Sequence, residues 1–129
     1  MEEKKLILTV LPDRFSICRL DPNEVVPVWA IAGSFFSVTR TSEELLVVCT
    51  EATIPEGTLN ERGWRCFKVH GPLEFSLTGI LSSLTVPLAE AGISVFAAST
   101  YDTDYLLVKE SRLEQARQVL SAAGHKVLD

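Results

Sequence analysis

Two acidic side chains separated by one residue are the clearest candidates for binding chemistry in this chain. Asp102 and Asp104 flank Thr103 in a segment that reads as a turn between two strands. A carboxylate at such a position can accept charge-assisted hydrogen bonds from an ammonium or guanidinium group. Acids in a hairpin turn also bond their own backbone, so the residue types alone leave both interpretations open.

A second candidate is the start of the helix that apolar spacing predicts over residues 78–91. Backbone N–H groups at a helix N-terminus point outward with the positive end of the helix dipole, so a carboxylate can bind there. Gly79, Ile80 and Leu81 occupy this helix start, and the absent side chain of Gly79 would allow a close approach. Tight packing of the helix on a sheet is the other reason for a glycine here.

The remaining reactive residue types form no catalytic or metal-binding pattern. Cys18, Cys49 and Cys66 are widely spaced within or beside strand-like segments, which predicts reduced thiols and gives no CxxC motif. His70 and His125 are far apart, and neither is placed by the sequence against a nucleophile. The glycines form no phosphate-binding loop. We therefore expect no enzymatic activity, no metal and no cofactor.

Composition and charge narrow the class of protein further. The chain has 129 residues, 47% of them hydrophobic, and a net charge of −5 without a run of Lys or Arg. This charge pattern provides no cluster of positive charge that would bind nucleic acid or an anionic membrane. The longest nearly apolar stretch, residues 25–36, contains Pro27 and Gly33 and is shorter than the roughly 20 residues that span a bilayer. The N-terminus lacks a secretory cleavage pattern, so we expect a soluble, cytoplasmic protein.

The second half of the sequence predicts the elements that would position the candidates. Its order is β-α-β-β-α-β, the ferredoxin-like arrangement. A Ser111–Glu114 capping box begins the second helix, which stops at Gly124. Pro87 lies inside the first helix, where we expect a kink or an irregular turn because proline removes the hydrogen bond to Ser83. The expected strands are residues 64–70, 94–101, 105–109 and 125–128.

The first half predicts mostly strands. One or two turns of helix in residues 24–32 are limited by Pro27. Residues 55–63 have the composition of a linker, so the expected domains are residues 1–62 and 63–129. The strand-like runs, residues 6–11 with 14–20 and residues 34–41 with 45–50, indicate two hairpins.

The two halves also resemble each other. A shift of 61 residues places Thr39–Val47 on Thr100–Val108, where a threonine, an acidic residue and Leu-Leu-Val coincide. This match indicates two related halves, the first with its helices degraded. Chance alignment of two strand-turn-strand segments is the alternative.

Three segments of the second half together resemble the ACT-domain family. They are GPLEFSLTGIL at residues 71–81, PLAEAGIS at residues 87–94 and STYDTDY at residues 99–105. More narrowly, they are similar to the branch shared by small prokaryotic ACT proteins and the cytosolic arginine sensors of the TOR pathway. The resemblance covers residues 64–126 well and the first half more faintly.

The resemblance implies an α+β protein of two ferredoxin-like (βαββαβ) halves of the ACT type, the N-terminal one degenerate. It also implies a non-catalytic regulatory module that binds an amino acid at an interface between ACT modules, near the loop from the first strand to the first helix. Asp104 matches the position that the sensors use. The expected ligand contacts are then Ser76, Gly79, Ile80, Leu81, Asp102 and Asp104.

Two points remain open in the sequence. The sensors carry additional acidic character where this chain has Leu77, so the resemblance does not extend to arginine as the ligand. A structural dimerisation or partner-binding module without a ligand is the alternative function, with Trp29, Phe35 and Phe36 as its contact. Both functions predict a homo-oligomer, because ferredoxin-like halves leave sheet edges that a symmetric partner can pair or cover.

Overall fold

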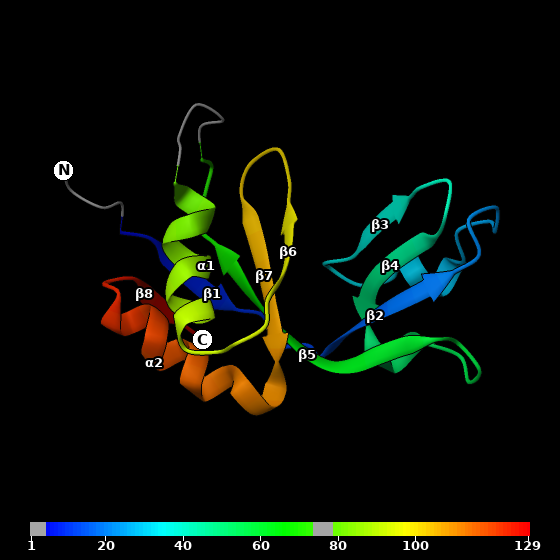
Figure 1. The fold of residues 1–129 in the computed structure, drawn as a ribbon. Coiled ribbons are helices and arrows are strands. Elements are labelled where there is room, and N and C mark those ends of the chain that lie inside the picture. The colour runs from blue at the N-terminus through cyan, green and yellow to red at the C-terminus, as the bar shows by residue number, and fades with distance from the viewer. Residues whose placement is uncertain (1–4, 74–78) are drawn as a thin grey trace. The chain divides into compact units, whose positions relative to one another are not determined.

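Two units make up the chain in the computed structural model, which describes residues 5–73 and 79–129. One unit consists of residues 13–64, and the other combines the segment up to Pro12 with the residues from Arg65 onward. The strand β5 (Asn60–Val69) contributes to both, since the division falls between Trp64 and Arg65. We call them the N-terminal and the C-terminal unit (Figure 1).

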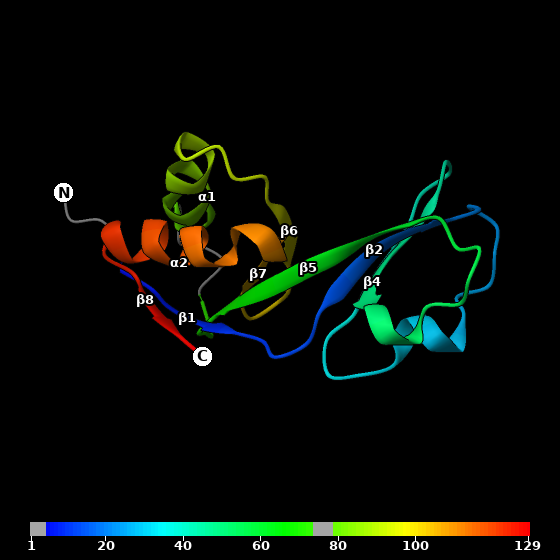
Figure 2. The same cartoon turned by 90° about the horizontal axis from the view of Figure 1, so that it is seen from below.

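The C-terminal unit has the expected β-α-β-β-α-β order, which confirms the ferredoxin-like fold. After β5 come α1 (Ile80–Glu90), β6 (Phe96–Ser99), β7 (Asp104–Lys109), the 3-10 turn η3 (Glu110–Arg112), α2 (Leu113–Ala122) and β8 (Lys126–Leu128). Strand β7 pairs with both β5 and β6. Both helices lie on one face of this sheet (Figure 2), and their buried leucines pack against Leu8, Phe67 and Val108.

The first strand of the chain, β1 (Ile7–Val10), also belongs to this sheet. It lies between β5 and β8, with Leu8 opposite Val69 on the antiparallel side and opposite Val127 on the parallel side. The predicted hairpin of residues 6–11 with 14–20 is therefore wrong. The turn residues after β1 predict a change of chain direction, but they do not determine which strand pairs with β1. The expected division into residues 1–62 and 63–129 assigns β1 to the first half, whereas its hydrogen bonds place it in the sheet of the second.

The two helices differ from prediction only at particular residues. Helix α1 continues through Pro87 without an irregular turn, while the kink expected there stays a prediction. The Ser111–Glu114 capping box does not form, because Ser111 lies inside η3, and α2 begins after Arg112 without a side-chain cap. Both helices end as predicted at glycines with positive φ, 74° at Gly92 and 99° at Gly124.

The N-terminal unit repeats the same order with its helices reduced to single turns. It consists of β2 (Phe15–Leu20), η1 (Val28–Ile31), β3 (Ser37–Arg40), β4 (Leu45–Thr50), η2 (Glu51–Thr53) and the first residues of β5. Its strand order is β3-β4-β2-β5. The buried core of this unit includes Cys18, Val47 and Cys49. The predicted pairing of residues 34–41 with 45–50 is confirmed as β3 and β4.

Equivalent turns relate the two units. Thr41 N–H donates to the Glu44 carbonyl at 2.9 Å, and Thr100 N–H donates to the Thr103 carbonyl at 2.8 Å. In each turn the threonine Oγ1 also accepts from the backbone N–H of the fourth residue, at 3.1 Å and 3.3 Å. The structural offset between the units is therefore 59 residues, two fewer than the sequence alignment suggests. A slip of two residues keeps every strand side chain on its own face, so hydrophobic patterning does not reveal it.

Candidate functional site

The β6–β7 turn and the segment that follows β5 contact each other at one end of the C-terminal unit. Leu73 N–H donates to the Asp102 carbonyl at 2.6 Å, and the buried Thr103 hydroxyl donates to the Val69 carbonyl at 2.7 Å. Gly71 fits between them: a Cβ there would lie 2.8 Å from the Asp102 oxygen and 3.1 Å from Thr103 Cβ. Only glycine allows this approach, so the turn is fixed against the start of the β5–α1 connection.

Asp104 projects from this end toward the helices. It is the first residue of β7, opposite Ser99 of β6, and its Oδ1 accepts a hydrogen bond of 2.6 Å from Ser99 Oγ. Leu106 and Val108 on the same strand pack in the core beneath α1 and α2. Side chains alternate along a strand, so the half-buried Asp104 shares their face of the sheet. Its carboxylate is thus oriented by Ser99 on the side of the sheet that carries α1.

Asp102 lies in the turn itself, where its side chain is exposed. Its backbone carbonyl receives Leu73 N–H, and the hydroxyl of Thr100 makes the hydrogen bonds that close the turn. Among the described residues, neither Asp102 nor Asp104 bonds the turn backbone through its carboxylate. The only side-chain hydrogen bond of these two acids, in the part of the chain that the structure describes, is the one that Asp104 accepts from Ser99 across the hairpin.

The start of α1 offers backbone donors, and its first turn contains no acidic residue. Gly79 is the N-cap residue with φ of 77°, it makes no side-chain cap, and the first helical turn carries no acidic residue. A Cβ at Gly79 would meet only Ser82 Oγ, at 3.7 Å, among the described atoms. The left-handed conformation, and not tight packing on the sheet, accounts for this glycine.

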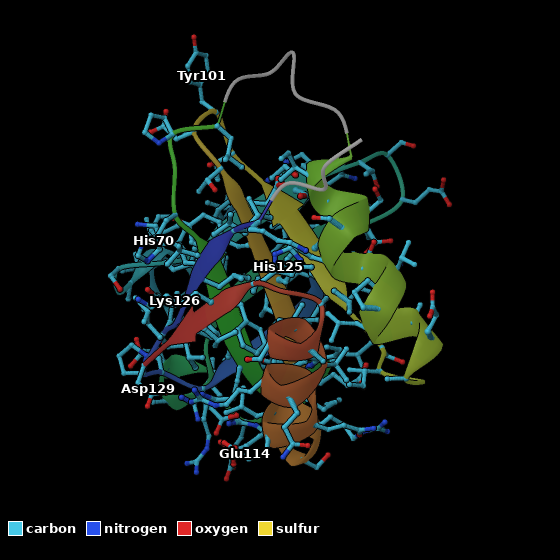
Figure 3. All side chains as sticks on the ribbon, turned by 90° about the vertical axis from the view of Figure 1, so that its left-hand side faces the viewer. His70, Tyr101, Glu114, His125, Lys126 and Asp129 are labelled. Atoms are coloured by element: carbon cyan, nitrogen blue, oxygen red, sulfur yellow. The ribbon has the colours of Figure 1, made fainter. Side chains whose placement is uncertain are left out.

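Of the predicted contacts, Ile80 and Leu81 can offer only main-chain groups. The Ile80 side chain is buried in the core, and Leu81 packs against it. Ser76 lies outside the described residues. The start of α1 and the β6–β7 turn lie at the same end of the unit (Figure 1), and Tyr101 marks the tip of that turn (Figure 3).

Ser99, Gly71 and Thr103 were not predicted as parts of the site. Ser99 stands in the segment that carries the family resemblance, so that segment held a signal for it. The roles of Gly71 and Thr103 come from contacts between β5 and the turn more than 30 residues away. No local pattern encodes such contacts.

The three thiols are buried, and their pKa values are shifted in different directions. Burial raises the pKa of Cys66 to about 12. The hydrogen bond between Cys49 and Cys18, together with burial, raises the pKa of Cys49, while the same hydrogen bond lowers the pKa of Cys18. All three are buried free thiols. Within residues 5–73 and 79–129, no group of three or more His, Cys, Asp or Glu side chains could hold a metal ion.

Of the helices in the described parts of the chain, none is both long enough and apolar enough to cross a membrane.

Comparison with known proteins agrees with this architecture. A family model described as ACT domain matches residues 60–122, and a second model, for an N-terminal domain, matches residues 13–57. The crystal structure of protein Atu0741 from Agobacterium tumefaciens is 41% identical, with a TM-score of 0.93 over 98% of this chain and 94% of that chain. The class of protein is thus a paired ferredoxin-like module with an ACT unit. The ACT-domain match covers residues 60–122, which include most of the C-terminal unit.

Two curated relatives are longer than this chain. A human protein named CASTOR3P is 34% identical over 101 residues, which cover 68% of this chain and 62% of that protein. The cytosolic arginine sensor for mTORC1 subunit 1 of Bos taurus is 33% identical over 90 residues, covering 61% of this chain and 27% of the sensor. The chain therefore spans less than two thirds of either relative.

A more distant structure shares the fold alone. The regulatory subunit of aspartate kinase from Thermus thermophilus has a TM-score of 0.63 at 11% identity, covering 91% of this chain and 96% of that subunit.

Proposed function

We propose that this chain is a non-catalytic regulatory module whose C-terminal ACT unit binds an amino acid. The observation that carries the proposal is the Asp104 carboxylate, held by Ser99 on the sheet face that bears α1. A free amino acid has a carboxylate and an ammonium group at a fixed separation. The N-terminus of α1 and Asp104 offer one complementary partner for each.

In this arrangement the ligand carboxylate accepts hydrogen bonds from main-chain N–H groups of Gly79, Ile80 and Leu81. The ligand ammonium group donates to Asp104, and Ser76 and Asp102 complete the shell. The similarity to a cytosolic arginine sensor supports a regulatory role of this kind, and the regulatory subunit of aspartate kinase shares the fold. We include a cytoplasmic location and a homo-oligomer in the proposal.

A dimerisation module without a ligand has less support from the side chains first considered for it. Phe35 is buried and packs edge-to-face on Phe15, with ring centroids 5.6 Å apart. Trp29 packs against the core of the N-terminal unit. Phe36, which is 41% exposed, is the remaining candidate from that group.

A thermal-shift screen of the purified chain against the protein amino acids tests the proposal, with molecular mass measured by light scattering for every hit. A ligand that binds only the folded state raises the melting temperature with concentration, by the equivalent of about 2.7 kcal/mol at a hundredfold excess over Kd. Asp104→Ala should weaken the binding of the hit roughly tenfold or more, because it removes a charge-assisted bond.

Glu90→Ala provides the matched control, since Glu90 is an exposed acid at the opposite end of α1. It should leave the affinity unchanged. A folded oligomer that shows no shift with any amino acid at millimolar concentration would replace this proposal with the dimerisation module.

A further inference from the structure

The side chain of His125 is buried where α2 ends and β8 begins. It is 6% exposed and follows Gly124, whose positive φ closes the end of α2 by directing His125 N–H to the Leu120 carbonyl at 3.1 Å. Figure 3 shows His125 beside the red strand β8. Each of the two ring nitrogens has a main-chain hydrogen-bond partner, and the two partners come from different segments of the chain.

One of these partners, the Ser83 carbonyl, is free to accept a hydrogen bond from His125 because of Pro87. In an α-helix the carbonyl of residue i accepts from the N–H of residue i+4, and proline has no N–H to offer. The carbonyl of Ser83 in α1 therefore lacks its helical donor. His125 Nε2 lies 3.1 Å from this carbonyl oxygen. The imidazole thus lies where it can supply the hydrogen bond that the helix cannot make.

The other partner determines which tautomer is present. Leu6 N–H, just before β1, lies 3.1 Å from His125 Nδ1. A main-chain N–H can only donate, so Nδ1 must be an unprotonated acceptor. Nε2 then carries the proton and donates it to Ser83. The neutral imidazole thus joins β1 to α1 by two hydrogen bonds of opposite sense.

We infer that His125 is a positioning residue, which holds the first turns of α1 at a fixed place over the sheet. Ser83, whose carbonyl it binds, donates its own N–H to the Gly79 carbonyl at 2.9 Å. A continuous path of hydrogen bonds therefore runs from Leu6 through His125 and Ser83 to the N-cap of α1. That N-cap is the helix end to which we assign the ligand carboxylate, so the effect on binding rests on the proposed function.

A double-mutant cycle between His125 and Pro87 tests the bond to Ser83 without any ligand. His125→Phe should lower the melting temperature by roughly 5 °C or more, because it leaves two buried main-chain groups unpaired. Pro87→Ala restores a helical donor for Ser83 but not a partner for Leu6 N–H, so the same His125 substitution should cost about half as much in that background. Equal losses in both backgrounds would overturn the assignment of the Ser83 bond.

Nitrogen-15 NMR of the imidazole in the unliganded wild-type chain gives an independent readout that requires no variant to fold. The inference predicts a protonated Nε2 and an unprotonated Nδ1 for His125. His70 serves as the reference histidine. It is exposed, and its Nε2 lies 2.6 Å from Thr9 Oγ1. The opposite tautomer at His125 would contradict the inference.

The effect on binding is measured with the amino acid that the screen identifies. His125→Phe should weaken its affinity roughly fivefold or more, His125→Phe combined with Pro87→Ala should recover most of that loss, and His70→Phe should leave it unchanged. Full affinity in a folded His125→Phe protein would refute the positioning role. If no amino acid binds the wild type, the proposed function fails, while the cycle and the NMR tautomer still decide whether His125 holds α1.

Discussion

Ser99 Oγ lies 2.6 Å from Asp104 Oδ1 across the end of the β6–β7 hairpin. A serine hydroxyl has a single hydrogen, and this one is directed at the carboxylate. The bond fixes one oxygen of Asp104 and orients the other. Asp104 is thus prepared for a second donor before any ligand arrives.

Removal of this bond should weaken ligand binding without removing the charge. In Ser99→Ala the carboxylate regains rotational freedom that binding must then restrict, so we expect an affinity roughly three- to tenfold lower by isothermal titration calorimetry. Ser121→Ala is the control, because Ser121 is exposed on α2. An unchanged affinity in Ser99→Ala would show that Asp104 is not oriented by Ser99 in the bound state.

Gly71→Ala should destabilise the chain. Gly71 does not have a positive φ, and at such a position alanine ordinarily stabilises by roughly 0.4–1 kcal/mol through the unfolded state. Here the added Cβ would lie 2.8 Å from the Asp102 oxygen, so we expect a loss of roughly 1–3 kcal/mol instead. Urea unfolding measures this difference, and a neutral or stabilising result would mean that the turn is not held against Gly71.

Substitutions of the equivalent threonines in the two turns distinguish an effect on stability from an effect on ligand binding. Thr41→Ala and Thr100→Ala each remove the hydroxyl hydrogen bond from the fourth residue of the turn, and Thr41→Ala also removes the one from Glu43 N–H, so each should cost about 1 kcal/mol or more of unfolding free energy. Only Thr100→Ala should also weaken amino-acid binding, because its turn carries Asp102 and precedes Asp104. The corresponding serine variants should retain both properties. Equal effects of the two alanine variants on binding would argue against the C-terminal unit as the ligand site.

Cys66 predicts a specific loss of stability at alkaline pH. Burial raises the pKa of this thiol from 9.0 to about 12, so the folded chain keeps the proton to higher pH than the unfolded chain does. The resulting stabilisation is complete below pH 9 and is lost as pH rises toward 12. Between pH 8 and about 10.5, the unfolding free energy of the wild type should fall by roughly 2 kcal/mol more than that of Cys66→Ala. Parallel curves for the two proteins would contradict the role of Cys66.

The helices of the C-terminal unit could be predicted closely from the sequence because their signals are local. The apolar residues Ile80, Leu84 and Leu88 recur at helical spacing, and Gly92 supplies the terminating conformation. Helix existence and end points therefore depend on residues within one segment. The same holds for the strand pair β3 and β4, whose partners are neighbours in the sequence.

The position of β1 could not be predicted in this way. Its alternating pattern identifies a strand with one buried face, but its partners, β5 and β8, lie about 60 and 120 residues away. Adjacency in the sequence favoured β2 instead. The sheet order is decided by packing of the whole unit, which a local pattern does not contain.

The candidate site was predicted in part for the same reason. Asp104 and Gly79 stand in recognisable turn and helix-start contexts, so residue type and local position point to them. Gly71 is required by a contact with Asp102, and the imidazole of His125 replaces a bond lost at Pro87. Those relationships join distant segments and become visible only once the chain is folded.

Residues 13–64 amount to an insertion within the ACT unit. Leu11 N–H donates to the Cys66 carbonyl at 2.8 Å, and Val10 lies opposite Phe67, so the two ends of this segment lie at neighbouring points on antiparallel strands. A two-residue turn is the commonest connection between adjacent antiparallel strands. Excision of the insertion would turn β1 and β5 into one hairpin and preserve the hydrogen bonds of the unit. Truncation from the N-terminus would instead remove the strand between β5 and β8, so we expect deletion from the middle, and not removal of the N-terminal segment, to leave an ACT unit that folds.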